Sequence, residues 1–178
     1  MELMDALKAM IESCRKCGLW KLRKNAIVGE GPIPCEVLFL GQNPGKMENE
    51  IGRPFVGRAG KFLDRLLALA NLSRAEVYLT GAVKCPTPKN RMPNRKEIEA
   101  CKEFLQVQLE VVRPKLIVAL GKVALQALGI SGSVLQLHGK LIEREGRRVF
   151  VTFHPSAAMR FPKIRELSFN DFKNLKVR

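Results

Sequence analysis

The sequence predicts an α/β fold, a three-layer α/β/α sandwich built around a four-stranded parallel sheet. Four short apolar runs have the length of buried strands, and the stretches between them place apolar residues at helical spacing. Strands that alternate with helices form parallel sheets covered on both faces. The chain of 178 residues contains no repeat or linker, so residues 1–178 are expected to form one domain. The expected strands are 36–40, 77–80, 116–120 and 149–153.

Helices are expected before and between these strands. The opening segment is amphipathic and carries Glu2 and Asp5, which is typical of a helix rather than of an export signal. A later helix stops before Pro114, because proline cannot continue a helix. The other expected helices, in chain order, are 59–70, 95–112 and the shorter 122–128.

Composition and charge limit the function classes. A hydrophobic content of 46% with 27% charged residues is typical of a folded protein and excludes wholesale disorder. The sequence has no run of 18 apolar residues and no signal peptide, so a cytoplasmic location without membrane contact is expected. The protein is also expected to be a monomer. The 31 Lys and Arg against 17 Asp and Glu give a net charge of +14, which attracts polyanions, nucleic acid above all. The alternative is a basic surface that only confers solubility.

Three of the expected strands are followed by polar or turn-forming residues. The first ends in "GQNPG" at 41–45, the second in "GAVKCP" at 81–86, and the fourth in "HPSAAMR" at 154–160. Amides after a strand are often simple turn formers. However, ligands of open parallel sheets bind beyond the carboxyl ends of the strands. The convergence of three such ends predicts a site at this edge.

The five cysteines suggest a metal centre rather than a disulfide framework. Cys14 and Cys17 form a C-x2-C pair, and Cys85 and Cys101 form a second, more widely spaced pair. Two separated pairs predict a four-thiolate site for an iron–sulfur cluster or zinc, and the spacing does not choose between them. Unrelated core cysteines are the alternative. Cys35, before the first strand, is expected to be a small buried residue.

Several motifs together resemble one known family. They are Cys14-x2-Cys17, "GQNPG", "GRPFVGRAG" at 52–60, "VKCPTPKNRMP" at 83–93, Cys101, "RPKLIVALG" at 113–121 and "HPSAAMR". Over nearly the whole chain, these resemble the uracil-DNA glycosylase superfamily, most closely its iron–sulfur branch, families 4 and 5. The resemblance implies a monofunctional DNA glycosylase that removes deaminated bases by hydrolysing the N-glycosidic bond and so initiates base excision repair. It also implies that Cys14, Cys17, Cys85 and Cys101 ligate a [4Fe–4S] cluster with a structural role.

The resemblance also implies roles for pocket residues. Such an enzyme takes its target base out of the helix stack and into a pocket. Phe55 matches the ring that stacks on the flipped base, and His154 matches the donor to the base O2, where negative charge develops. Gly41 and Gln42 are expected to border the base, with backbone N–H groups near Gln42 facing the same charge.

DNA contacts are expected on the loops at the same edge. The family inserts a side chain from the segment after His154 into the gap that the flipped base leaves, and Met159 is the best apolar wedge, with Ala158 beside it. Arg160 is expected to hold a flanking phosphate, as are Lys84 and Arg91 from the loop after the second strand.

The chain departs from its branch at Gln42 and at Gly81. Gln42 stands where family 4 usually has a glutamate, and Asn43 stands where the mismatch-specific family 2 carries a water-positioning asparagine. Asn43 is therefore expected to orient the attacking water without acting as a general base. Gly81 replaces an asparagine that hydrogen-bonds the uracil edge in family 4. The absence of this asparagine side chain is expected to open space beside the base. The enzyme is therefore expected to accept hypoxanthine or xanthine as well as uracil.

Two other functions fit parts of the pattern. The first is a catalytically inactive iron–sulfur DNA-binding protein. It would keep the fold but lack the glutamate and the asparagine that family 4 carries at the positions of Gln42 and Gly81. The second is a zinc-bearing RNA-binding domain. It is the weaker alternative, because such a domain would not need "HPS" after a strand.

Overall fold

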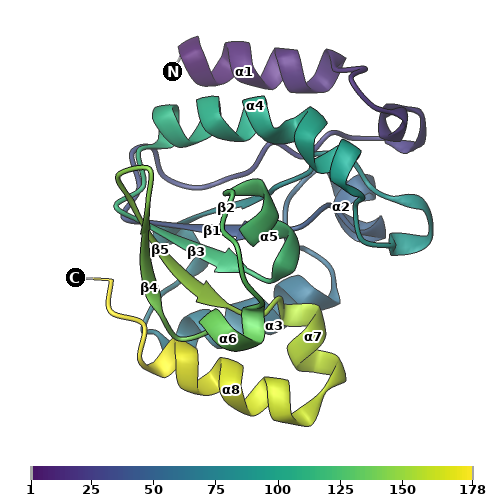
Figure 1. Ribbon diagram of the computed structural model, residues 1–178. Coiled ribbons are helices and arrows are strands. Elements are labelled where there is room, and N and C mark those ends of the chain that lie inside the picture. The colour runs from purple at the N-terminus through teal and green to yellow at the C-terminus, as the bar shows by residue number, and fades with distance from the viewer. Residues whose placement is uncertain (1, 178) are drawn as a thin grey trace.

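The computed structural model describes residues 2–177 and has the expected α/β/α layers, with helices above and below one central sheet (Figure 1). The sheet has five strands in the order β2-β1-β3-β5-β4. The first four strands in this order run parallel, and β4 pairs antiparallel with β5 at the edge. The strands are β1 (Val37–Gly41), β2 (Val77–Gly81), β3 (Leu116–Leu120), β4 (Leu141–Arg144) and β5 (Arg147–Thr152).

The four parallel strands confirm the predicted fold class, but the strand count of four is wrong. The missed strand β4 is short, mostly exposed and reads "LIER", so it lacks the apolar run that marks a buried strand. It joins β5 through a two-residue turn in which Glu145 and Gly146 both have positive φ, the conformation that tight hairpins require. An edge strand with one solvated face does not need a continuous apolar sequence.

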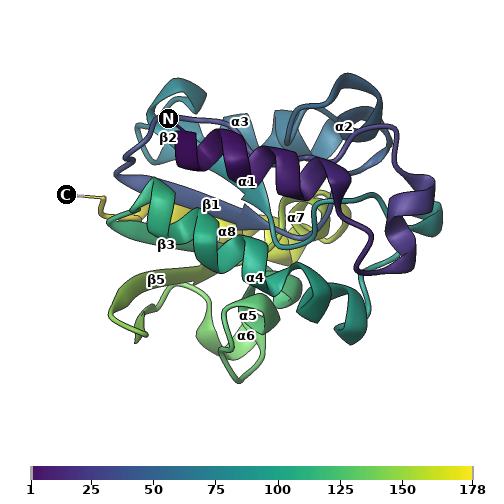
Figure 2. The ribbon, with the colours of Figure 1, turned by 90° about the horizontal axis from the view of Figure 1, so that it is seen from above.

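The helices cover both faces of the sheet. One face packs on α3 (Arg58–Leu69), α7 (Pro155–Arg160) and α8 (Pro162–Lys173). The other packs on α4 (Arg95–Val112) and α5 (Lys122–Ala127). The helix α1 (Glu2–Ser13) packs along α4, on the same side of the sheet (Figure 2). Shorter turns are α2 (Lys46–Ile51), α6 (Val134–Leu137), η1 (Gly18–Leu22), η2 (Arg74–Glu76) and η3 (Pro88–Asn90).

Local sequence explains the bounds of the long helix α4. Asn94 caps its first turn by accepting a hydrogen bond from the backbone of Glu97, whose side chain accepts one from the Asn94 N–H. The helix ends at Arg113, which has a left-handed conformation immediately before Pro114. Between these ends, an apolar stripe lies on the sheet, as predicted for residues 95–112.

Backbone hydrogen bonds join the loops at the carboxyl ends of β1 and β2. Ala82 N–H donates to Gly41 O at 3.2 Å, and Val83 N–H donates to Gln42 O at 2.8 Å. These bonds continue the ladder beyond the strands and fix the two loops against each other. Between residues 2 and 177, no helix is both long and apolar enough to cross a membrane.

Candidate active site

A pocket of about 390 Å³ lies at the carboxyl ends of the strands, where the sequence predicts a site. It brings together the predicted residues of three strand ends and of the loop between α2 and α3. Its volume is in the range that binds small ligands, so one nucleobase can enter. The predicted residues that line it are Gln42, Asn43, Phe55, Gly81 and His154.

Two aromatic rings form one wall of the pocket. The Phe55 and His154 rings are stacked, with centroids 6.3 Å apart and planes at 28°. The Phe55 ring lies directly over Gly41, where an added Cβ would be 2.5 Å from the ring. Phe55 itself has φ of 51°, a conformation that costs a bulky residue about 1 to 3 kcal/mol. Glycine at position 41 is therefore required by the ring that covers it.

The hydrogen bonds of His154 fix its tautomer. The backbone N–H of Ser156 donates to His154 Nδ1 at 3.2 Å, so Nδ1 accepts and Nε2 carries the proton. The Ser156 hydroxyl lies 2.7 Å from the same nitrogen. Burial lowers the pKa of His154 to about 4, so the ring is neutral near pH 7. His154 therefore offers a neutral N–H donor.

Asn43 has an amide whose orientation follows from its neighbours. Its Nδ2 donates to Pro44 O at 3.1 Å and to Thr87 Oγ1 at 3.2 Å. The Thr87 hydroxyl donates its single proton to Arg91 O and can therefore only accept from Asn43. The amide oxygen of Asn43 is buried and has no hydrogen-bond partner within residues 2–177. A buried acceptor of this kind requires a donor, such as a water molecule.

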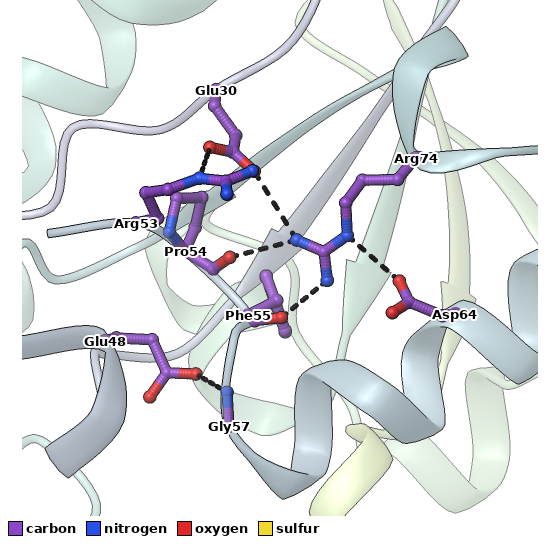
Figure 3. Close-up of polar contacts among 8 residues, drawn as sticks. All are labelled: Glu30, Glu48, Arg53, Pro54, Phe55, Gly57, Asp64 and Arg74. Carbon is purple, nitrogen blue, oxygen red and sulfur yellow. Dashed lines mark hydrogen bonds and ion pairs between the residues drawn. The ribbon is translucent and has the colours of Figure 1, made fainter. Parts of the chain in front are cut away.

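Glu48 joins the two loops that line the pocket. Its carboxylate accepts from Gly45 N–H at 3.1 Å and from Gly57 N–H at 2.8 Å, the second of which is drawn in Figure 3. Sequence reasoning missed this residue, although the spacing of Gly45 and Glu48 at the start of α2 is that of a capping box. It also missed Thr87 and Ser156, which orient Asn43 and His154.

Gly81 borders the pocket, but the space beside it is not open as expected. An added Cβ would be 3.0 Å from Val83 O and 3.2 Å from Gln42 O. These two carbonyls are brought close by the backbone hydrogen bonds that join the β1 and β2 loops. Glycine at position 81 offers no hydrogen-bonding side chain, and the structure has no cavity in the direction of its Cβ.

Lys84 does not lie on the surface, so its predicted phosphate contact is wrong. Its side chain is 1% exposed, and its Nζ donates to Thr80 Oγ1, Gly81 O and Gln108 Oε1 at 2.6 to 2.8 Å. Burial lowers the pKa of Lys84 to about 7. An ammonium held by three internal acceptors cannot reach DNA.

The segment after His154 forms the helix α7 rather than an open loop, which changes the predicted wedge. Ala158 is fully buried against the core under α3 and α8, so it cannot enter DNA. Met159 is partly buried against the same core, whereas Arg160 is exposed. Sequence reasoning missed Phe161, which is 52% exposed and has the Arg160 guanidinium 5.8 Å from its ring centre.

Other basic residues surround the pocket mouth. Lys46 and Arg58 line the pocket and are exposed. The predicted Arg91 is also exposed, but its guanidinium forms a two-point ion pair with Glu97 at 2.7 and 2.8 Å. The charge of Arg91 is therefore partly neutralised by Glu97. Lys46 and Arg58 are better placed to contact DNA phosphates.

The four predicted metal-binding cysteines line one small cavity between α1, η1 and α4. Cys85 and Cys101 are buried there, and Cys14 and Cys17 are half-buried. Burial raises the pKa of Cys101 to about 11, while Lys16, Arg23 and Lys84 line the same cavity. Within the described residues, no set of three or more His, Cys, Asp or Glu side chains is arranged as a metal-binding group.

Cys35 lies elsewhere, buried in the sheet core, and its backbone N–H donates to Val112 O. The cavity between α1, η1 and α4 therefore holds four thiols beside cationic side chains. This set of side chains fits a metal centre with several thiolate ligands.

The sequence of the chain is similar to those of known proteins. A model of the uracil DNA glycosylase superfamily matches residues 28–175. A type-4 uracil-DNA glycosylase of Archaeoglobus fulgidus is 40% identical, covering 98% of this chain and 92% of the relative. One of Thermotoga maritima is 38% identical, covering 98% and 94%. A type-5 uracil-DNA glycosylase of Pyrobaculum aerophilum is 32% identical, covering 84% and 74%. Matches of this extent show that the chain belongs to the uracil-DNA glycosylase superfamily.

Proposed function

We propose that the protein is a monofunctional DNA glycosylase that hydrolyses the N-glycosidic bond of uracil in DNA. One observation carries this proposal: His154, with its proton on Nε2, and Asn43, whose buried amide oxygen has no partner among residues 2–177, line the same pocket. The relatives that cover nearly the whole chain are named uracil-DNA glycosylases, which supports the same substrate.

The Phe55 ring would hold the flipped base. Taking a base out of the stack loses its stacking contacts, and a ring in the pocket replaces part of them. Phe55 is half-buried in the pocket wall beside His154, so its ring forms a rigid face for the base.

His154 would stabilise the leaving base. As the glycosidic bond breaks toward an oxocarbenium-like sugar, negative charge develops on the base, including its O2. A neutral Nε2–H donor aimed at that oxygen lowers the barrier because its bond strengthens as the charge grows. The Ser156 contacts keep the proton on Nε2, which supports this role.

Asn43 would position the attacking water. An amide oxygen accepts one water O–H and leaves a water lone pair free for the anomeric carbon. It cannot take a proton, so the reaction relies on the positive charge of the sugar to draw in the water. Thr87 supports this role because its hydroxyl accepts from Nδ2 and so fixes which atom of the amide is left free to accept. Gln42 lines the same pocket and would border the base.

DNA would bind across the pocket mouth through the excess positive charge of the protein. Lys46 and Arg58 are exposed in the pocket lining, Arg160 is exposed on α7, and all three would contact phosphates. Met159 and the exposed Phe161 are the side chains that could fill the gap in the duplex.

Cys14, Cys17, Cys85 and Cys101 would hold a [4Fe–4S] cluster, supported by their shared cavity and by the type-4 relatives. When bound, the cluster supplies four metal–thiolate bonds that fix the segment after α1 to α4 and to the loop after β2. The purified protein is expected to be brown, and a colourless protein with one zinc would refute the assignment.

The substrate range would extend beyond uracil. Gly81 offers no side chain to hydrogen-bond the base edge, and a site without such groups discriminates weakly. Hypoxanthine and xanthine are the further candidates, especially in mispairs, which are easier to flip.

The test is single-turnover cleavage of duplexes that carry uracil, hypoxanthine, xanthine or thymine opposite guanine. Release of uracil with comparable release of one purine is expected. Binding without release of any base would refute the proposal and favour an inactive DNA-binding protein.

A further inference from the structure

Arg74 contacts the pocket loop from outside the pocket. It lies in η2, immediately before β2, and its side chain is 26% exposed. Its Nη1 donates to Pro54 O at 3.2 Å, and its Nη2 donates to Phe55 O at 2.5 Å (Figure 3). One guanidinium therefore binds two successive carbonyl groups of the segment that carries the pocket ring.

The backbone of Phe55 depends on such a partner. A bulky residue with φ of 51° adopts a conformation that side chains rarely tolerate. Its carbonyl oxygen lies directly against Gly60, where an added Cβ would be 1.7 Å away. The carbonyl is thus held between the helix α3 and the Arg74 guanidinium. A planar fork of donors suits this arrangement, because it can bind two adjacent acceptors at once.

Acidic residues fix the guanidinium itself. Arg74 Nε donates to Asp64 Oδ1 at 3.0 Å, and Nη1 lies 3.5 Å from Glu30 Oε1. Glu30 is bound in turn by Arg53, through two hydrogen bonds of 2.8 and 3.0 Å. Figure 3 shows this chain of ion pairs ending at the Pro54 and Phe55 carbonyls. The network orients Arg74 toward the loop rather than toward solvent.

We propose that Arg74 is the positioning residue of the Phe55 ring, holding it over Gly41 and beside His154 for base stacking. The proposal rests on the glycosylase function proposed above. Without the two hydrogen bonds, Phe55 relaxes to negative φ, and its ring leaves the pocket wall. A stacking contact holds the base in both the ground and transition states, so its loss raises KM more than it lowers kcat.

The first experiment follows the ring without using activity. Aromatic proton–carbon NMR spectra are recorded for the wild type and for Arg74→Met, with the Phe55 signals assigned from their loss in Phe55→Leu. Arg74→Met is expected to shift or broaden the Phe55 ring signals. Arg53→Gln is the matched control, because it breaks an ion pair of the same network that does not involve Arg74, so both carbonyl contacts and the Phe55 signals should stay as in the wild type. Unchanged Phe55 signals in Arg74→Met would refute the proposal.

Arg74→Lys covers the case in which the methionine variant does not fold. It keeps the charge and loses the planar fork, so a displaced ring is expected here too. A ring that stays in place in a folded Arg74→Lys protein would show that charge alone is enough and that the two-carbonyl geometry is irrelevant.

The second experiment is a double-mutant cycle on uracil cleavage. Arg74→Met is expected to raise KM about tenfold, as small misplacements of binding groups do. In the Phe55→Leu background it should add little, since two residues that act through one contact are not additive. Fully additive effects would refute the proposal. If the wild type cleaves no base, the glycosylase function fails, while the NMR experiment still decides whether Arg74 places the ring.

Discussion

The loops that follow β1 and β2 leave neighbouring strands at the same edge of the sheet, yet they do different things. The β1 loop carries Gln42 and Asn43 into the pocket, with one amide oxygen left without a partner among the described residues. The β2 loop is buried from Ala82 to Thr87, and the charge of Lys84 is satisfied internally. The β1 loop places polar side chains in the pocket lining, and the β2 loop packs against the β1 loop.

This difference shows that position at a strand end is only part of a site prediction. The parallel topology places both loops at the carboxyl edge. Which side chains face the pocket depends on how the loops pack on each other, here through the Ala82 and Val83 backbone bonds. The following predictions test whether the β1 loop determines the cleavage rate and the β2 loop determines stability.

The largest effect is expected in the β1 loop. Asn43→Ala should lower the single-turnover rate about 100-fold or more, the range for losing a group that positions a reactant. The melting temperature should fall only modestly, since Asn43→Ala removes the two hydrogen bonds of Nδ2 together with an oxygen that has no partner among residues 2–177. Gln42→Ala, the matched variant in the same loop, should cost less. If Gln42→Ala proves the slower enzyme, the water belongs to Gln42.

A substitution in the β2 loop should change the stability of the protein rather than its cleavage rate. Lys84→Met leaves Thr80, Gly81 and Gln108 without their donor, so the free energy of unfolding should fall by about 1 to 3 kcal/mol. Denaturant unfolding measures this effect.

The salt dependence of DNA binding supplies the contrast for Lys84→Met. Its slope should stay as in the wild type, whereas exposed Arg160→Ala should reduce the slope by about one without loss of stability. A reduced slope in Lys84→Met would mean that this lysine reaches phosphate after all.

A smaller effect is expected where the two loops meet. Thr87→Val removes the acceptor of the Asn43 amide and frees it to turn, so the single-turnover rate should fall about tenfold. Thr87→Ser keeps the hydroxyl and should restore most of the rate. A loss of rate in Thr87→Ser with none in Thr87→Val would indicate that packing of the threonine methyl, rather than amide orientation, is what matters.

The smallest effect concerns pH. Because the pKa of His154 is lowered to about 4, the cleavage rate should show no histidine inflection between about pH 6 and 8. The free energy of unfolding should nevertheless depend on this residue. In the unfolded chain its pKa is 6.5, so the stability that depends on a neutral His154 is present above pH 6.5 and is lost as pH falls toward 4.

The difference in stability between the wild type and His154→Gln, measured across this window, isolates the contribution of His154. A rate inflection near pH 6.5 that disappears in His154→Gln would contradict the lowered pKa.

Sequence predicted the parallel core and the pocket well, and it failed where packing decides. The buried strands and helix α4 follow from local apolar periodicity and caps, which one segment of sequence contains. The edge strand β4 lacks that periodicity. Lys84 looked like a surface cation because lysine is rarely buried, and only the fold brings Gln108 and Thr80 to it.

The same limit applies to the residues that orient the site. Arg74 precedes β2 and Phe55 precedes α3, and the contact between them spans elements that no local pattern links. Ala158 had the small side chain expected of a DNA-contacting loop, but the segment is a helix with one face on the core. Pairing across elements requires tertiary structure.

The carbonyl groups that crowd Gly81 have an evolutionary consequence. A side chain at position 81 would place its Cβ 3.0 Å from Val83 O and 3.2 Å from Gln42 O, so these carbonyls must give way by a few tenths of an ångström before a larger residue fits. A change from glycine at this position therefore needs an adjustment of two neighbouring loops as well as a new codon. Directed evolution toward strict uracil specificity should therefore find its solutions at other pocket positions.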